Sequence, residues 1–258
     1  MNKNGLVSVI INCHNAEKYI SKSIISVLKQ TYKNFEIILF DNKSTDRTRK
    51  IVNNFHSKKI RYFYCKRYLK LGAARNLAIE KARGKYVAFL DSDDTWYKDK
   101  IKKQIKFLKK NNLKICFSNY FNFYEKKKRK IKAIKKKLKK ISTQSLIDCY
   151  SIGILTVLME KSLLRYKKFS EKLNIIEDFD FFINLSLKEK FGYLNNALAV
   201  YRIHDGNFSH KKKIYLKELK NWIKKNEMIF LKKNIKMKKL KIQLIKLEIK
   251  KIFNFSLI

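Results

Sequence analysis

The stretch VSVIINCHNAEKYISKSIISVLKQTYKNFEIILFDNKSTD, residues 7–46, decides the fold class. Segments 6–12 and 35–40 are short and almost wholly apolar, which is typical of strands buried on both faces of a sheet. Between them, Ile20 and Ile24 lie at helical spacing, and we expect Asn15 to cap this helix. This strand–helix–strand order predicts two parallel strands joined by a helical crossover.

The same alternation continues through the first half of the chain. We expect strands at 60–65, 86–90 and 115–124, and helices at 73–83 and after residue 96. Such an order requires a parallel sheet covered on both faces, and these sheets bind ligands beyond the carboxyl ends of their strands. Asp41 and the run from Asp91 to Asp94 fall at those ends. The sequence therefore predicts an α/β protein with a mostly parallel sheet flanked by helices, and a ligand site beside these aspartates.

The composition excludes several classes of protein. With 45% hydrophobic residues, the chain can build a core, which excludes wholesale disorder. No apolar run approaches the roughly 18 residues of a membrane-spanning helix, and the N-terminus lacks a secretory signal, so we expect a cytoplasmic protein. The four scattered cysteines form no zinc or redox pair, and the six glycines form no phosphate-binding loop.

The formal net charge of +41 comes from 62 Lys and Arg against 21 Asp and Glu. Nucleic-acid binding is one interpretation, because many lysines can contact phosphates through counterion release. Only nine of the basic residues are Arg, however, and no helix-turn-helix, zinc-finger or RRM signature is present. A solvated lysine surface is therefore favoured, and no nucleic-acid partner is expected.

Lysine is concentrated in two segments of the second half. Residues 126–140 hold eleven cationic side chains with apolar residues at helical spacing, which is consistent with a solvated helix, a membrane-surface patch or a mobile insertion. Residues 211–258 are expected to form a basic amphipathic helical extension, because Ile242, Ile245 and Ile249 align on one helical face. Both segments suit peripheral binding to anionic lipid at the inner face of the cytoplasmic membrane.

Asp91, Asp93 and Asp94 place three carboxylates within four residues. Burial of these mutually repelling groups is costly unless a cation or hydrogen-bond donors compensate. All-oxygen ligands select Mg²⁺ or Mn²⁺, and Mg²⁺ commonly binds through one or two carboxylates together with substrate phosphates. A helix-capping role for Asp93 or Asp94 would account for one aspartate, but hardly for all three.

Residues 7–46, followed by GAARNLAIEKARGKYVAFLDSDD (72–94) and IIEDFDFFINLSLKEKFGYLNNALAVYRIHDGNFS (175–209), resemble a bacterial family 2 glycosyltransferase. The likeness covers about residues 6–210 in several ordered blocks. It implies the Rossmann-like GT-A fold over 1–210, with a nucleotide-binding half at 1–112 and an acceptor-side half at 113–210. Residues 211–258 would then be the helical extension.

The resemblance also implies roles for single residues. The donor nucleotide would be contacted by five of them: Asn12, Asp41, Asn42, Arg75 and Asp91. The DxD motif of the family corresponds to Asp91 and Asp93, with Asp93 the metal ligand and His204 a second metal or diphosphate contact. Asp178 matches the catalytic base, and Glu177 would orient or contact the acceptor. From the residues alone, Glu177 and Asp178 could equally form an acidic helix start, which the helix dipole favours.

Two departures from the family pattern concern the base pocket. The segment at 12–15, Asn-Cys-His-Asn, stands where Pro-x-Tyr-Asn is commoner, and Asn42-Lys43 stands where Asp-Gly is commoner. The identity of the nucleotide is therefore open. Lys43 is expected to adopt, with a side chain, a turn that glycine usually makes.

The resemblance implies an enzyme of hexosyl or N-acetylhexosaminyl transfer. A divalent cation, Mn²⁺ or Mg²⁺, would stabilise the leaving diphosphate of a nucleotide-sugar, expected to be a UDP-sugar. Asp178 would deprotonate the acceptor hydroxyl in a single displacement with inversion. The expected acceptor is a cell-surface glycan or lipid-linked molecule, as in lipopolysaccharide or capsule synthesis. The alternative is a catalytically inactive or nucleic-acid-binding basic α/β protein.

Overall fold

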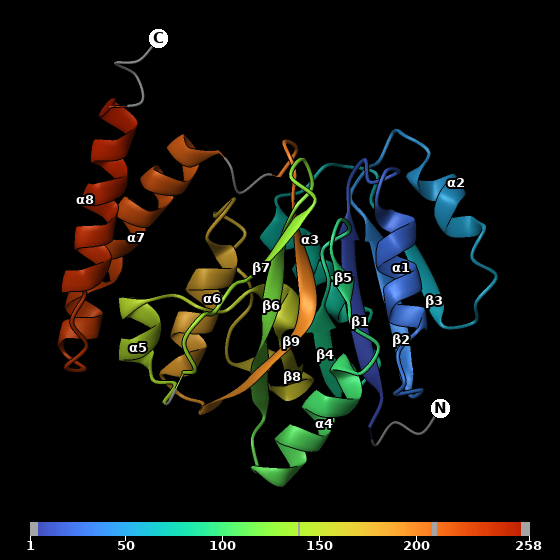
Figure 1. Ribbon diagram of the computed structural model, residues 1–258, viewed down its shortest axis with the longest axis horizontal. Coiled ribbons are helices and arrows are strands. Elements are labelled where there is room, and N and C mark those ends of the chain that lie inside the picture. The colour runs from blue at the N-terminus through green and yellow to red at the C-terminus, as the bar shows by residue number, and fades with distance from the viewer. Residues whose placement is uncertain (1–4, 139, 208–210, 254–258) are drawn as a thin grey trace.

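A twisted nine-stranded sheet carries helices on both faces in the computed structural model, which describes residues 5–138, 140–207 and 211–253 (Figure 1). The strands are β1 (Val7–Cys13), β2 (Phe35–Asp41), β3 (Ile60–Tyr64), β4 (Tyr86–Phe89), β5 (Thr95–Trp96), β6 (Ile115–Tyr124), β7 (Arg129–Lys132), β8 (Leu158–Glu160) and β9 (Phe191–Ile203). The α-helices are α1 (Ile20–Leu28), α2 (Thr48–Asn53), α3 (Leu71–Glu80), α4 (Lys100–Lys110), α5 (Thr143–Asp148), α6 (Glu177–Ser186), α7 (Lys212–Leu231) and α8 (Lys238–Phe253), with 3₁₀ turns η1 (Ile154–Thr156) and η2 (Lys161–Arg165).

The first half of the sheet is parallel, as the crossovers require. Strands β3, β2, β1 and β4 lie side by side in that order, and β1 pairs in parallel with both β2 and β4. Beyond β4 the sheet becomes mixed, because β8 pairs antiparallel with β4 and β6, while β9 runs parallel to β6. The α/β fold is confirmed, and the carboxyl ends of β1, β2 and β4 meet at one edge of the sheet.

Strand residues alternate between two apolar cores, one on each face of the sheet. In β1, Val9 and Ile11 belong to the core shared with α1 and α4, whereas Ile10 belongs to the core shared with α3 and α6. Each central strand is therefore buried on both faces, which explains its nearly continuous apolar sequence.

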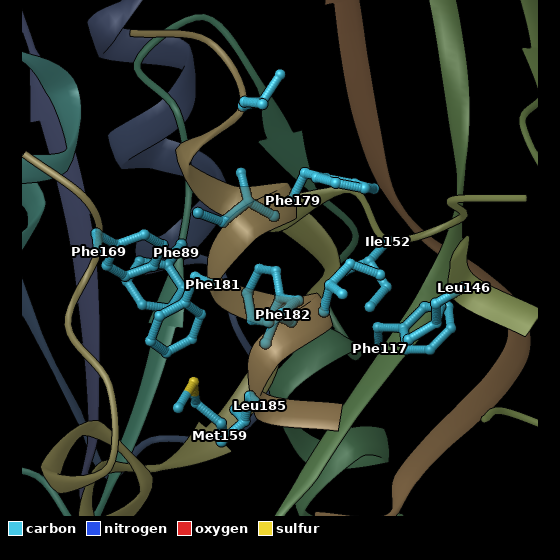
Figure 2. Packing of buried hydrophobic residues seen from close by; sticks show 14 of the residues in the cluster. Phe89, Phe117, Leu146, Ile152, Met159, Phe169, Phe179, Phe181, Phe182 and Leu185 are labelled. Atoms are coloured by element: carbon cyan, nitrogen blue, oxygen red, sulfur yellow. The ribbon is translucent and has the colours of Figure 1, made fainter. Parts of the chain in front are cut away.

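Helix α6 is the centre of the larger core. Phe181 and Phe182 are fully buried on it, and Phe169 stacks on Phe181 with ring centroids 4.3 Å apart. Figure 2 shows this aromatic cluster around α6, with Phe169 and Phe89 on one side and Phe117 on the other. The packing fixes α6, and with it the acidic residues of its first turn.

The helix interpretation of residues 126–140 and the cap expected at Asn15 were wrong. The described part of the lysine-rich segment contains no helix, because β7 folds back on β6 as an antiparallel hairpin. Asn15 does not cap α1; its backbone is left-handed (φ 48°), and its side-chain oxygen accepts a hydrogen bond from the Thr45 N–H instead. Asn15 thus ties the loop after β1 to the loop after β2.

The C-terminal segment is helical, as expected, and packs on the larger core. Leu219, Trp222 and Phe230 of α7 and Leu240 and Leu244 of α8 are buried there. Helices α7 and α8 lie side by side at the end of the molecule farthest from α2 (Figure 1). Among the described residues, no helix combines the length and the hydropathy needed to cross a membrane.

Candidate active site

One cavity of about 720 Å³ opens where the strands β1 and β4 end, and it is large enough for a nucleotide-sugar. It is lined by most of the residues that the sequence analysis singled out: Asn12, Asn42, Arg75, Asp91, Asp93, Glu177 and Asp178. Asp41 and His204 are not in its wall. The chain therefore brings residues from both halves, more than 160 positions apart, into one site.

The three aspartates after β4 have different surroundings. Asp91 and Asp93 line the cavity, whereas Asp94 is fully buried and accepts a hydrogen bond from the Arg202 N–H at 2.8 Å. Asp94 thus fixes β9 against the loop. Burial raises the pKa of Asp93, and the charge of Asp91 adds to this effect. A cation bound beside Asp93 would oppose this shift.

The oxygen ligands in the cavity suit a hard divalent cation whose coordination is completed by a bound substrate. Among the described residues, no group of three or more His, Cys, Asp or Glu side chains is arranged to hold a metal ion alone. Two cavity-lining carboxylates fit the pattern in which phosphate oxygens complete the coordination. The residues present therefore fit Mg²⁺ or Mn²⁺ together with a diphosphate.

His204 lies behind Asp93, with its Nε2 3.0 Å from Asp93 Oδ2. The Gly206 N–H donates to His204 Nδ1, which places the ring proton on Nε2 and makes His204 the donor to Asp93. As a metal ligand, His204 would have to move this proton to Nδ1 and give up the bond from Gly206. Its role as a ligand stays a prediction.

Arg75 joins the two acidic regions of the site. Its guanidinium is only 3% exposed; NH2 donates to Asp91 Oδ1 at 3.1 Å, and NH1 donates to Glu177 Oε1. Because Arg can donate to two carboxylates from one rigid plane, Arg75 fixes the loop after β4 relative to α6. The sequence analysis placed Arg75 near the nucleotide but did not anticipate its contact with Glu177.

Glu177 and Asp178 form the first turn of α6, so the acidic helix start and the cavity position are both present. Burial raises the pKa of Asp178 to about 6, although the charge of Arg75 opposes the shift. Burial likewise raises the pKa of Glu177, and its Oε2 is buried without a hydrogen-bond partner. A half-buried carboxyl group with a pKa near neutrality is suited to act as a general base.

The predicted base pocket divides into lining and supporting residues. Asn12 lines the cavity, and its buried side-chain N–H group has no partner, so it can donate to a ligand. Asn42 is held at both ends of its amide by the backbone of Leu69. Asp41 is fully buried and accepts hydrogen bonds from Tyr62 at 2.6 Å and from the Ser44 N–H at 2.8 Å. Lys43 adopts the left-handed turn (φ 64°), as expected.

Two cavity residues were missed by sequence reasoning. His14 and Tyr68 line the cavity beside Asn42, and their rings meet edge to face with centroids 4.8 Å apart. His14 stands at the Tyr position of the commoner Pro-x-Tyr-Asn, and this correspondence could have indicated that it lines the cavity. Tyr68 lies in an irregular segment after β3, where no pattern indicated a role.

The part of the cavity wall formed by η1 is held by side chains of β5 and α4. Trp96 Nε1 donates to the Leu155 carbonyl at 2.8 Å, and Gln104 Nε2 donates to the Thr156 carbonyl at 2.7 Å. The buried Lys100 ammonium lies 2.7 Å from Gln104 Oε1. These contacts fix η1, whose residues Ile154 and Leu155 line the cavity.

The family model described as "Glycosyl transferase family 2" matches residues 8–171. The chain belongs to glycosyltransferase family 2. An uncharacterized glycosyltransferase of Haemophilus influenzae is 35% identical over 211 residues, which cover 80% of this chain and 83% of that protein. The Escherichia coli UDP-Glc:alpha-D-GlcNAc-diphosphoundecaprenol beta-1,3-glucosyltransferase WfgD is 34% identical over 226 residues, 83% of each chain. The protein is therefore a sugar-transferring enzyme.

Solved structures show the same GT-A fold. Residues 1–349 of TarS of Staphylococcus aureus, in complex with UDP-GlcNAc, superpose with a TM-score of 0.70 at 22% identity, over 84% of this chain and 66% of that one. The mannosyltransferase PcManGT of Pyrobaculum calidifontis, in complex with GDP-Man and Mn²⁺, superposes with a TM-score of 0.62 at 14% identity, over 81% of this chain and 60% of that one. The predicted family and fold are thus confirmed.

Proposed function

We propose that this glycosyltransferase transfers a hexose or N-acetylhexosamine from a UDP-sugar to a lipid-linked glycan, with a divalent cation and with inversion at the sugar carbon. The observation that carries the proposal is that Asp91, Asp93 and Asp178 all line the same cavity. A relative that acts on UDP-Glc and a diphosphoundecaprenol-linked sugar, and a structural neighbour bound to UDP-GlcNAc, support the donor and the acceptor class.

Asp93 and Asp91 would hold the cation. The Mn²⁺ in PcManGT, which has the same fold, supports the use of a divalent cation. When bound, a divalent cation neutralises the charge that develops on a leaving diphosphate. Arg75 keeps Asp91 in place, and Asn12 offers its unpartnered N–H group to the nucleotide. Asp41 supports this pocket from behind by holding Tyr62 and the Ser44 N–H.

Asp178 removes the proton of the acceptor hydroxyl while the oxygen attacks the sugar carbon. With the leaving group on the opposite side of that carbon, one displacement inverts its configuration. Such proton transfer typically contributes about 10²–10⁴-fold to the rate. Glu177, locked to Arg75, contributes a second acceptor-side oxygen, its unpartnered Oε2.

A thermal-shift screen tests the donor class. The protein would be heated with UDP-, GDP-, CMP- and dTDP-sugars, each with and without Mn²⁺, because a ligand that binds the folded state raises its melting temperature. We expect the largest increase with a UDP-sugar and Mn²⁺ together. An increase with GDP-, CMP- or dTDP-sugars alone would contradict the UDP assignment, and no increase with any donor would contradict the proposed function.

A peripheral position at the inner face of the membrane is part of the proposal. Helix α8 buries Leu240 and Leu244 but leaves Ile242, Ile245 and Ile249 between 41% and 54% exposed along its outer face. Lysines flank this outer apolar stripe, including Lys238 and Lys246. An apolar stripe with a basic border is suited to the surface of an anionic bilayer, near a lipid-linked acceptor.

Sedimentation with vesicles tests this position. We expect Ile245→Asp to reduce binding to phosphatidylglycerol vesicles by about tenfold, because it places a charge in the stripe. Asn53→Asp, an exposed position on α2 at the other end of the molecule, is the control with the same charge change and should bind normally. Equal binding of Ile245→Asp and the parent protein would exclude the stripe as the membrane contact.

A further inference from the structure

Glu218 of α7 holds the backbone that leads into the proposed catalytic base. Its Oε1 accepts hydrogen bonds from the Asn174 N–H and from Asn174 Nδ2, both at 2.7 Å. Its Oε2 accepts from the Ile175 N–H at 3.0 Å and the Ile176 N–H at 3.3 Å. Four donors thus converge on one carboxylate that is only 9% exposed.

These contacts lie immediately before α6 and end at its N-cap residue, Ile176, whose own side chain provides no cap. Helix N-termini leave N–H groups unsatisfied and favour a nearby negative charge. Glu218 provides an acceptor and a charge for the loop that enters α6, from a helix more than 40 positions later in the chain.

The backbone held by Glu218 forms part of the cavity. Asn174, Ile175, Glu177 and Asp178 all line it. Helix α7 also holds α6 after Asp178, where Trp222 Nε1 donates to Asp180 Oδ1 at 2.8 Å. Asp178 therefore lies between two attachments of α6 to α7, one before it and one after it.

The same helix contributes to the surroundings of Asp178. Burial raises the pKa of Tyr215, on the turn before Glu218, and the charge of Asp178 raises it further. The charge of Asp178 therefore acts on a side chain of α7. A shift of α7 would change both the direction of Asp178 and its exposure to water.

We propose that Glu218 is a positioning residue for Asp178: by binding the backbone of residues 174–176 it sets the orientation in which Asp178 meets the acceptor. The inference rests on the proposed function. It makes the first turns of α7 part of the catalytic centre, although their side chains do not touch the reacting atoms. A base displaced by about 1 Å can cost up to about 10²-fold in rate.

The test compares Glu218→Gln with Glu227→Gln, which removes the same charge from the same helix at a half-exposed ion pair with Lys241. The readouts are the kcat and KM of UDP-glucose hydrolysis with Mn²⁺, the Kd of UDP, and the pH profile of kcat. We expect Glu218→Gln to lower kcat about tenfold, with the KM and the UDP Kd within about twofold of the parent values. The acid limb of kcat in Glu218→Gln should move to lower pH, because a loosened loop admits water to Asp178 and so lowers its pKa.

Glu227→Gln should match the parent protein in every readout. Normal kcat and an unshifted pH profile in Glu218→Gln would overturn the inference, as would an equal loss of kcat and UDP affinity. If Glu218→Gln does not fold, Trp222→Phe replaces the indole by a smaller aromatic ring and removes the bond to Asp180. We then expect a loss of about threefold in kcat with unchanged UDP affinity, and no loss would overturn the inference.

Parent protein and Asp178→Asn are assayed beside these variants. Hydrolysis by the parent and its loss in Asp178→Asn, together with a normal Glu218→Gln, would defeat only the positioning role. Absence of hydrolysis in the parent would instead contradict the proposed function.

Discussion

The two sides of the cavity are built in different ways. On the proposed donor side, Asn12 lies near the end of β1, and Asn42, Asp91 and Asp93 follow the ends of β2 and β4, so the parallel backbone itself places them. On the proposed acceptor side, the segment from Asn174 to Asp178 and η1 are held by side chains of distant elements, above all Glu218 and Gln104. Strand topology thus fixes the proposed nucleotide pocket, whereas long-range side-chain contacts fix the proposed base.

The largest effect is expected on the donor side. Asp93→Ala removes the carboxylate that we expect to bind the cation, so Mn²⁺-dependent hydrolysis of UDP-glucose should fall by about 10³-fold. Asp99→Ala, at a carboxylate that does not line the cavity and pairs with Lys103, is the control and should keep full activity. If Asp93→Ala releases UDP at the parent rate, Asp93 does not bind the cation as proposed.

A smaller effect, confined to turnover, is expected on the acceptor side. Asp178→Asn keeps the size of the side chain but cannot accept the proton, so turnover should fall by about 10²-fold or more. Calorimetry should give a Kd for UDP within about twofold of the parent value, because the nucleotide pocket is intact. Glu171→Gln, an exposed carboxylate in the preceding loop, serves as the control. A joint loss of UDP affinity and turnover in Asp178→Asn would mean that the two sides are not separable.

The pH dependence should separate the two sides as well. Because burial raises the pKa of Asp178 to about 6, the base becomes protonated and inactive as the pH falls through that value. We expect kcat to fall about tenfold between pH 7 and pH 5, and this acid limb should vanish in Asp178→Asn. An acid limb that persists in Asp178→Asn would have to arise from another titrating group.

The smallest effect is expected at the aromatic edge of the nucleotide pocket. Tyr68 is 56% exposed and meets His14, so the two rings offer a surface on which a base can stack. Tyr68→Ala should raise the Kd of UDP about fivefold, at the lower end of base-stacking energies, with little change in kcat. Tyr166→Ala, an equally exposed tyrosine outside the cavity, should leave UDP binding unchanged.

This comparison also explains what the sequence could predict. The parallel strands, Asp91 and Asp93 were predictable because burial makes each strand an apolar run and topology brings the strand ends together. The antiparallel β8 and the β6–β7 hairpin were not, because β8 is three residues long and the apolar residues around β7 lie at helical spacing in the sequence. Arg75–Glu177 and Glu218–Asn174 join residues 102 and 44 positions apart, and no local pattern specifies such pairs.

Calorimetric titration of UDP, first with Mn²⁺ and then with EDTA, tests the central claim most directly. The account predicts binding in Mn²⁺ that is lost in EDTA and in Asp93→Ala but is retained by Asp178→Asn. Equal UDP affinity in Mn²⁺ and EDTA, or unchanged binding by Asp93→Ala, would contradict it.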